Sequence, residues 1–161
     1  MDQAPDTFLS ISVVDEAATA RIAARLASIL RRGDVILLEG TLGAGKTALA
    51  RQLVRALAGD DDLVVASPTF TFSQVYDELP LLVTHFDLYR MGEPEEVFDL
   101  GWDDARADGL TLVEWPDKLG PHRPEDALTL RIDLVASAET ARKLRFGGNP
   151  AWQARLAGFS S

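Results

Sequence analysis

The chain has 161 residues, a net charge of −9, 47% hydrophobic residues and no cysteine. This length is typical of one domain with its own core, so we expect a single domain over residues 1–161. The absence of cysteine excludes disulfides and thiolate metal sites, and no apolar run approaches the roughly 20 residues of a membrane-spanning helix. The acidic balance argues against a protein that holds nucleic acid on its own surface.

Residues 7–13 predict a short first strand. Asp15 is a typical N-cap for a helix that runs to about Arg32, with apolar residues at helical spacing. Gly33 is placed as the residue that follows the end of this helix.

The apolar run at residues 35–38 is typical of a strand that is covered on both faces. A glycine-rich loop follows, and then a helix from Lys46 to about Ala58. Short acidic helices are expected within residues 93–108, and a last helix at 150–157. Further strands are expected at residues 63–66, 70–76, 81–86, 110–114, 127–135 and 143–146, with the second and third of these paired as a hairpin. This order predicts an α/β fold with a mixed parallel and antiparallel central sheet.

Residues 40–47 read Gly-Thr-Leu-Gly-Ala-Gly-Lys-Thr and fit the P-loop (Walker A) pattern G-x4-G-K-[ST]. By average residue frequencies, such a match arises by chance in well under ~1% of chains of this length. The alternative is a glycine-rich turn that merely joins a strand to a helix. The motif instead predicts a nucleotide site of a P-loop NTPase-like, three-layer α/β fold, with its binding residues at Leu42, Gly43, Ala44, Gly45, Lys46, Thr47 and Ala48.

The residue types explain how such a loop binds phosphate. Glycine permits the backbone angles that turn successive N–H groups inward as an anion nest. The start of the following helix presents further unpaired N–H groups to the anion. Lys46 is expected to reach the β- and γ-phosphates of ATP, and the Thr47 hydroxyl to ligate Mg²⁺.

Two apolar runs end in a carboxylate, Asp87 after residues 81–86 and Glu114 after residues 110–113. Because ligands of open α/β sheets collect beyond the carboxyl ends of strands, both acids are expected beside the P-loop. There they would position Mg²⁺ and the attacking water, with Glu114 as the Walker-B-like residue. The alternative is that each acid simply ends a strand at the surface.

Other polar residues carry weaker signals. The Ser-Pro-Thr sequence at residues 67–69 either senses the γ-phosphate through a hydroxyl or forms an ordinary turn. His85 is interpreted as a satisfied core histidine and Trp115 as a core residue. For Tyr89 and Arg90 two interpretations are open: they contact phosphate or a partner, or they lie at a solvent-exposed strand end.

Charge is unevenly distributed along the chain. Residues 93–108 contain seven acidic residues and a single basic one, whereas basic residues outnumber acidic ones from Leu128 onward. The two segments are either solvated faces or a pair of interaction surfaces of opposite sign.

Four blocks in order, with the short length, closely resemble the TsaE (YjeE) family of bacterial ATPases. They are Leu42–Thr47, Ser67–Phe70, His85–Arg90 and Val113–Pro116. The resemblance covers roughly residues 15–146, and the tail beyond Gly147 matches weakly.

The resemblance implies a role in making threonylcarbamoyladenosine at position 37 of tRNA. In that family the ATPase does not transfer the group itself but docks on a TsaB–TsaD heterodimer, so tRNA is met only indirectly through the complex. The absence of cysteine fits a cytoplasmic location, and residues 1–6 show no secretory signal.

Residue by residue, the resemblance implies that Lys46 and Thr47 hold phosphate and Mg²⁺. Asp87 and Glu114 would serve the metal and hydrolysis, and Thr69 would lie in a switch-like loop. The segment that enters the first helix, near Glu16, would contact the nucleotide.

Two rival functions remain open. A small-molecule kinase would usually add a lid with several arginines, and no segment resembles one. A GTP-dependent switch would use an Asn-Lys-x-Asp loop, yet Asn149 is the single asparagine of the chain and Pro150 follows it. The D-x-x-G match at residues 117–120 lies past the strand end that Glu114 occupies and is interpreted as coincidence.

Overall fold

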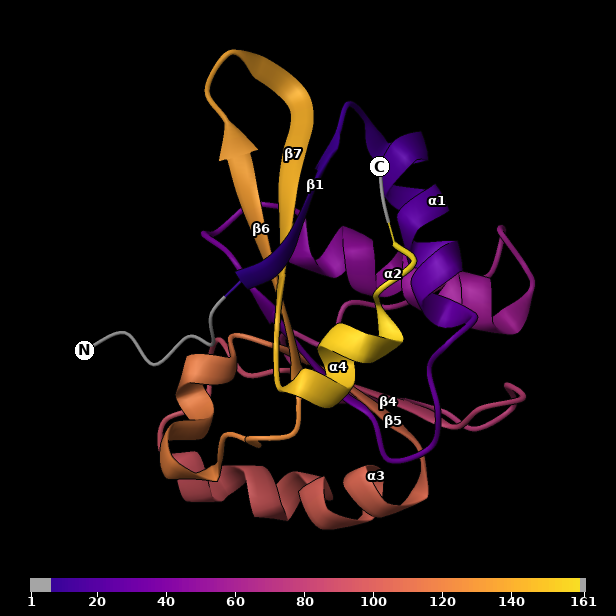
Figure 1. Ribbon diagram of the computed structural model, residues 1–161. Helices are drawn as coiled ribbons and strands as arrows, with labels where there is room; N and C mark the ends of the chain where they lie inside the picture. Colours follow the sequence, from indigo (N-terminus) through magenta and orange to yellow (C-terminus); the bar gives the residue numbers. More distant parts are fainter. Residues whose placement is uncertain (1–6, 160–161) are drawn as a thin grey trace.

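The computed structural model describes residues 7–159, and residues 1–6, for which the sequence predicted no secretory signal, lie outside that range. Seven strands form one sheet in the spatial order β1-β7-β6-β2-β5-β4-β3 (Figure 1). The strands are β1 (Thr7–Val13), β2 (Val35–Glu39), β3 (Ser73–Tyr76), β4 (Val83–Asp87), β5 (Leu110–Glu114), β6 (Leu128–Val135) and β7 (Ala138–Gly147).

The sheet is mixed, as the sequence predicted. Strands β6, β2, β5 and β4 run parallel and form its centre. Antiparallel strands extend it on both sides, β3 beside β4 and the β7–β1 pair beside β6. The parallel register places the last residues of β4 and β5, Asp87 and Glu114, directly side by side at the carboxyl edge.

Helices cover both faces of this sheet. One apolar cluster packs the sheet against α1 (Glu16–Ala27), α2 (Lys46–Ala58) and α4 (Pro150–Arg155). A second cluster packs the opposite face against α3 (Trp102–Asp108) and the 3₁₀ helices η1 (Pro94–Leu100) and η2 (Pro116–His122). In Figure 1, α3 lies below the sheet and α1, α2 and α4 lie on its other side. The result is a three-layer α/β fold of the P-loop NTPase-like type.

Burial on both faces explains the apolar runs of the central strands. Residues 35–38 of β2 and all of β4 and β5 are buried. Each fully buried aliphatic side chain contributes about 1.5–3 kcal/mol relative to an exposed one. These buried strands therefore hold the residues at their carboxyl ends in fixed positions.

The first helix is shorter than predicted. Asp15 is its N-cap and accepts a hydrogen bond from the Ala18 amide at 2.8 Å, but α1 ends at Ala27 rather than near Arg32. Ser28 closes the last turn through a bond from its hydroxyl to the Arg25 carbonyl. Gly33 lies five residues beyond the cap in a separate turn, where its N–H donates to the carbonyl of Gly109. Its positive φ of 92° serves that turn and not the helix end.

The segment between α2 and β4 also differs from expectation. Residues 63–66 form no strand, although Val65 is buried in the core. The β3–β4 hairpin is confirmed, but β3 begins at Ser73 instead of residue 70 because Phe72 adopts a positive φ of 67°. In the opposite sense, β7 extends well before the predicted residues 143–146.

The chain beyond residue 147, which the sequence assigned poorly, packs onto the core. Trp152 of α4 is buried, and its indole N–H donates to the carbonyl of Asp126 at 2.8 Å. Within residues 7–159, no helix combines the length and the apolar character that crossing a membrane requires.

Candidate nucleotide-binding site

The P-loop joins the end of β2 to the start of α2, where its motif predicted it. Gly45 is the N-cap of α2 with a left-handed φ of 113°, and no side chain caps this helix. The first turn of α2 therefore keeps its N–H groups for an anion. At Gly40, an added Cβ would lie 2.8 Å from the backbone oxygen of Ile132, so this position accepts only glycine without movement of β6.

A cavity of about 340 Å³, which we call the P-loop cavity, opens beside this loop. Its lining contains nine of the eleven predicted site residues, drawn from the loop, α2, the Ser-Pro-Thr segment and two strand ends. They are Leu42, Gly43, Gly45, Lys46, Thr47, Ala48, Thr69, Asp87 and Glu114. Tyr89 and Trp115 complete the lining.

Lys46 is folded back onto the loop. Its Nζ donates to the carbonyl oxygens of Gly40 and Thr41, both at 2.8 Å, and lies 4.1 Å from the centre of the Trp115 ring. Burial lowers the pKa of Lys46, and the nearby carboxylates of Glu114, Asp87 and Asp117 oppose that change. The ammonium group is thus held at the cavity by neutral acceptors that a phosphate can replace.

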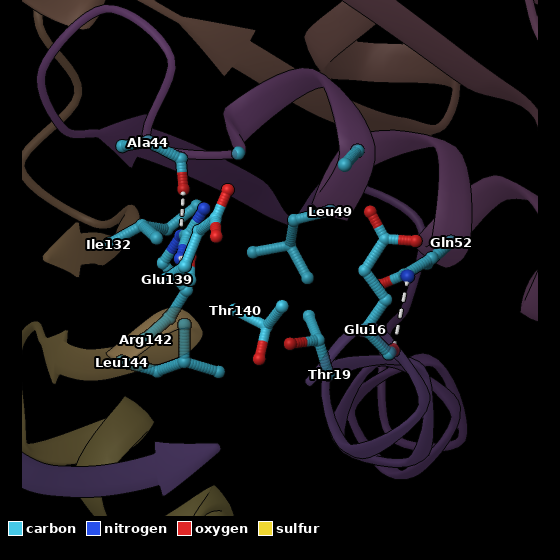
Figure 2. A pocket seen from close by; sticks show the side chains of 12 residues that line it. Glu16, Thr19, Ala44, Leu49, Gln52, Ile132, Glu139, Thr140, Arg142 and Leu144 are labelled. Carbon is cyan, nitrogen blue, oxygen red and sulfur yellow. Dashed lines mark hydrogen bonds between the residues drawn. The ribbon is translucent and has the colours of Figure 1, made fainter. Parts of the chain in front are cut away.

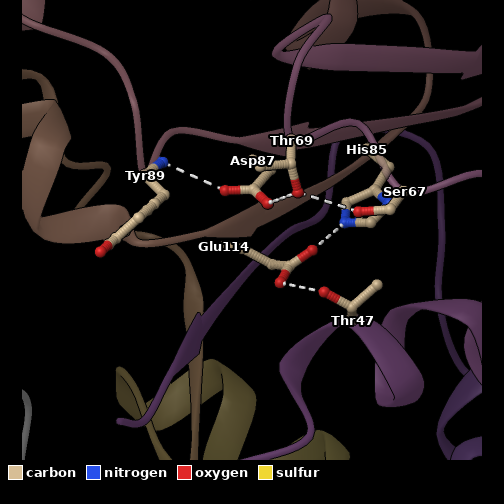
Figure 3. Close-up of polar contacts among 7 residues, drawn as sticks. All are labelled: Thr47, Ser67, Thr69, His85, Asp87, Tyr89 and Glu114. Carbon is tan, nitrogen blue, oxygen red and sulfur yellow. Dashed lines mark hydrogen bonds and ion pairs between the residues drawn. The ribbon is translucent and has the colours of Figure 1, made fainter. Parts of the chain in front are cut away.

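Glu114 is almost fully buried and uses both carboxylate oxygens. Oε1 accepts a hydrogen bond from the Thr47 hydroxyl at 2.7 Å, and Oε2 lies 2.7 Å from Nε2 of His85 (Figure 3). Because a carboxylate can only accept, His85 presents its Nε2–H to Glu114. The predicted Mg²⁺ ligand of the P-loop and the predicted Walker-B-like acid are therefore in direct contact.

Asp87 lies next to Glu114 and is bound from the other side. Its Oδ2 accepts from the Thr69 hydroxyl at 2.9 Å, and its Oδ1 accepts from the Tyr89 amide at 3.1 Å. Ser67 extends this chain of contacts, since its hydroxyl lies 2.9 Å from that of Thr69 (Figure 3). The Ser-Pro-Thr segment thus connects to the strand-end carboxylate.

These oxygen donors fit a magnesium ion. Mg²⁺ is usually bound by one or two carboxylates together with substrate phosphates and water, and not by a cage made of protein alone. Thr47, Glu114 and Asp87 supply a hydroxyl and two carboxylates at the edge of the phosphate nest. Residues 7–159 contain no group of three or more His, Asp or Glu side chains that could hold a metal ion by themselves.

The two remaining predicted residues, Glu16 and Ala44, line a second cavity of about 300 Å³. It lies between α1, α2 and the β6–β7 hairpin, and we call it the α1–hairpin cavity (Figure 2). Gly45 and Ala48 line both cavities, so the two adjoin at the start of α2. The structure therefore brings Glu16 to the same loop as the other residues but outside the P-loop cavity.

Three residues contact the candidate site although the sequence did not assign them to it. His85 is buried as expected, but it contacts Glu114 and does not simply fill the core. Its spacing of two from Asp87 on one strand was the available signal, because such residues share a face. Trp115 is half-buried and contacts Lys46 and Tyr89, with 4.9 Å between the two aromatic ring centres. Arg142 lines the α1–hairpin cavity, and no local pattern indicated it.

Fold and site together define an α/β protein of the P-loop NTPase-like class, with two carboxylates beside the glycine-rich loop. Within that class, the model of one family, threonylcarbamoyl adenosine biosynthesis protein TsaE, matches residues 13–144. The chain therefore belongs to the TsaE family, which acts in the biosynthesis of threonylcarbamoyladenosine in tRNA.

Curated relatives agree with this membership. The tRNA threonylcarbamoyladenosine biosynthesis protein TsaE of Streptomyces coelicolor is 42% identical over 125 residues, which are 75% of this chain and 82% of the relative. The protein of the same name from Nostoc sp. is 37% identical over 132 residues, 79% of each chain. The one from Rickettsia felis is 38% identical over 103 residues, 64% of this chain, and the match spans 60% of that relative's length.

A solved structure supports the fold. The crystal structure of YdiB from Bacillus subtilis superposes with a TM-score of 0.74 at 26% sequence identity. The superposition covers 97% of this chain and 95% of that one. The overall architecture described above is therefore shared with a protein of known structure.

Proposed function

We propose that this protein is a Mg²⁺-dependent ATPase that supports the threonylcarbamoylation of adenosine 37 in tRNA. The observation that carries the proposal is the 2.7 Å contact between Thr47 of the P-loop and the buried Glu114. It joins a phosphate-binding motif to an acid at a strand end, as Mg²⁺-dependent phosphoryl transfer requires. Membership of the TsaE family supplies the tRNA modification.

Each residue has a distinct task in this proposal. Lys46 exchanges the carbonyls of Gly40 and Thr41 for the β- and γ-phosphate oxygens, a stronger charge-assisted interaction. The N–H groups at the start of α2 bind the phosphates from the other side. Thr47, Glu114 and Asp87 would hold the metal, which when bound neutralises charge on the phosphate oxygens.

Hydrolysis also needs an oriented water molecule. The carboxylates of Glu114 and Asp87 lie side by side at the strand ends, so they can accept hydrogen bonds from a water beyond the γ-phosphate. Thr69, the last residue of the Ser-Pro-Thr segment, donates a hydrogen bond of 2.9 Å to Asp87 and so connects this segment to the position of the proposed water. A change in this segment on nucleotide binding would therefore reach the hydrolytic site directly.

The α1–hairpin cavity is the proposed place for the adenosine part of the nucleotide. It adjoins the P-loop cavity through Gly45 and Ala48, and its lining mixes apolar side chains with polar groups, Glu16 among them. Such a mixed lining is typical of small-ligand sites. A nucleotide with its phosphates in the P-loop cavity would reach it across the start of α2.

The proposed partner is a TsaB–TsaD-like heterodimer in the cytoplasm, with tRNA met through that complex. A net charge of −9 fits a protein that leaves most of the tRNA to its partners. The acidic residues of η1 and α3 are mostly exposed and form one candidate docking face.

Phosphate release from Mg²⁺–ATP, measured with and without a purified TsaB–TsaD pair, tests the proposal. We expect slow hydrolysis that the pair stimulates, and loss of it in Glu114→Gln. Transfer of phosphate to a small acceptor would instead favour a metabolite kinase. Absence of binding to the pair in every nucleotide state would refute the pathway role and leave the ATPase proposal standing.

A further inference from the structure

Arg142 of β7 reaches across to the P-loop. Its Nε donates to the carbonyl oxygen of Ala44 at 2.9 Å, as Figure 2 shows, over a sequence separation of 98 residues. Its Nη1 donates to the carbonyls of Glu139 and Ala141, both at 2.8 Å, which fixes the guanidinium on its own hairpin. The side chain is half-buried in the wall of the α1–hairpin cavity.

The hairpin that carries Arg142 is itself anchored against the nucleotide site. Thr140 donates its hydroxyl to the carbonyl of Val14, just before the cap of α1. At the other end of the loop, the backbone of Ile132 in β6 lies so close to Gly40 that a Cβ there would come within 2.8 Å of its oxygen. Arg142 is therefore a fixed donor and not a mobile surface side chain.

The hydrogen bond from Arg142 to the Ala44 carbonyl also affects the direction of the Gly45 N–H. The Ala44 carbonyl and the Gly45 N–H belong to one trans peptide, so they point in opposite directions. Ala44 lines the α1–hairpin cavity, whereas Gly45 lines both cavities. A donor that holds the carbonyl toward the α1–hairpin cavity thus turns the N–H toward the P-loop cavity. Gly45, with its φ of 113°, would otherwise leave this peptide free to rotate.

We propose that Arg142 is a positioning residue of the phosphate site, which orients the Ala44–Gly45 peptide so that the Gly45 N–H faces the bound phosphates. The inference rests on the proposed nucleotide function, since it assumes that the P-loop binds phosphate. Arg142 itself stays on the side of the loop away from the phosphates and acts through the backbone.

Three variants separate this role from the alternatives. Arg142→Met removes the donor, and Arg142→Gln removes the charge but keeps an amide that can donate to the Ala44 carbonyl. Lys143→Met removes one positive charge from the next residue of β7, whose exposed side chain points to the other face of the sheet. Titration calorimetry with Mg²⁺–ATP and with inorganic tripolyphosphate measures binding, and the ¹H–¹⁵N signal of Gly45 reports on the peptide directly.

We expect Arg142→Met to weaken the binding of ATP and of tripolyphosphate by the same factor. That factor is roughly three- to tenfold, which corresponds to one lost hydrogen bond. The Gly45 signal should shift in the ligand-free protein, Arg142→Gln should restore most of the affinity, and Lys143→Met should match the wild type. Weaker ATP binding with unchanged tripolyphosphate binding would mean that Arg142 contacts the nucleoside, which overturns the proposal. Unchanged binding of both ligands, or no rescue by glutamine, would overturn it as well.

The test also distinguishes this inference from the proposed function. If the wild-type protein binds tripolyphosphate but hydrolyses no ATP, the ATPase proposal fails and the role of Arg142 is still measured. If it hydrolyses ATP and Arg142→Met leaves the Gly45 signal in place, only the inference fails.

Discussion

Nε2 of His85 lies 2.7 Å from Oε2 of Glu114, and both side chains are almost completely buried, with exposed fractions of 1% and 2%. The contact fixes the carboxylate whose other oxygen accepts from Thr47. Nδ1 of His85 is buried and has no hydrogen-bond partner among residues 7–159, so this histidine interacts with the site through Nε2 alone. The orientation of the Glu114 side chain is thus set by His85 of the neighbouring strand β4.

Removal of His85 should therefore impair hydrolysis more than nucleotide binding. We expect His85→Ala to lower the rate of ATP hydrolysis about ten- to a hundredfold, the usual effect of losing a group that orients a metal-binding side chain. His85→Gln, whose amide can replace the Nε2–H, should retain more activity. His122→Ala is the matched control, because His122 is partly exposed and contacts Glu95 on the surface. Equal rates for both alanine variants would contradict the prediction.

Lys46→Ala should weaken ATP binding at least about tenfold, since each lost charge-assisted hydrogen bond costs roughly 1.5–3 kcal/mol. Calorimetric titration with Mg²⁺–ATP measures the change, and Lys143→Ala controls for the loss of one positive charge at an exposed position. An unchanged affinity would refute the assignment of the phosphate site.

The lowered pKa of Lys46 predicts a pH dependence. In the proposed site Lys46 would hold phosphate only when protonated, so the affinity for ATP should fall as pH rises through a pKa below that of an ordinary lysine. Between the lowered pKa of Lys46 in the folded protein and the ordinary lysine pKa of the unfolded chain, the unfolded chain binds more protons than the folded one. Over that pH range the contribution of Lys46 to the stability of the ligand-free protein therefore increases as pH rises. Titrations of the wild type and of Lys46→Ala with ATP at several alkaline pH values measure the affinity. The fall in affinity that Lys46 causes should be absent from the variant.

Thr69→Val should slow hydrolysis about tenfold, because it removes a hydroxyl that donates to the Asp87 carboxylate and keeps the side-chain shape. Thr69→Ser should retain most of the rate. Thr71→Val is the control, since Thr71 is exposed and its hydroxyl donates only to the nearby Ser73 carbonyl. Steady-state phosphate release measures all three, and a slow Thr71→Val variant would show that the loop as a whole, not the Asp87 contact, is sensitive.

Charge reversal on the acidic face should weaken binding of the proposed TsaB–TsaD-like partner several-fold at low salt and less at high salt. The structure decides which acids to change. Glu96 is unsuitable because it accepts from the Glu93 amide in a capping box, so reversal there would disturb η1. Asp99→Lys with Asp103→Lys changes exposed residues instead. An unaltered affinity at low salt would remove this face from the interface.

Arg155→Met should lower the free energy of unfolding by about 1–3 kcal/mol, because it leaves the carboxylate of a mostly buried pair, Asp34, without its charged partner. The two side chains are 18% and 13% exposed and meet through two hydrogen bonds of 2.8 and 2.7 Å. Arg131→Met is the matched control, since Arg131 pairs with Asp133 at the surface and is 46% exposed. Urea unfolding compares them, and equal effects would mean that the Arg155–Asp34 pair contributes no more to stability than an exposed ion pair does.

Local patterns predicted the parts of the fold that depend on neighbouring residues. The P-loop, the start of α2 and the central strands follow from glycine positions, a motif and apolar runs, and the structure has them where the sequence placed them. The errors fell where tertiary contacts compete with local preference. Residues 63–66 look like a strand, yet they pair with no strand among residues 7–159. Val65 enters the core, and Leu63 packs against it from a half-buried position.

The basic C-terminal segment shows the same limit. As a sequence it is one candidate for an interaction surface. In the structure, Arg142 bonds the P-loop, Arg155 pairs with Asp34, and Arg145 and Arg131 both contact Asp133. Most of its charge is therefore used within the fold, which leaves the acidic face as the more exposed of the two.

The sequence by itself determined which residues form the candidate site, because a P-loop is made by consecutive residues and because parallel strands bring their terminal acids to one edge. Only the tertiary structure decided which groups hold those residues in place. Thr47 and Glu114 are 67 residues apart, His85 and Glu114 are 29 apart, and Arg142 and Ala44 are 98 apart. Contacts over such separations depend on strand order and side-chain direction, which no local pattern of residues encodes.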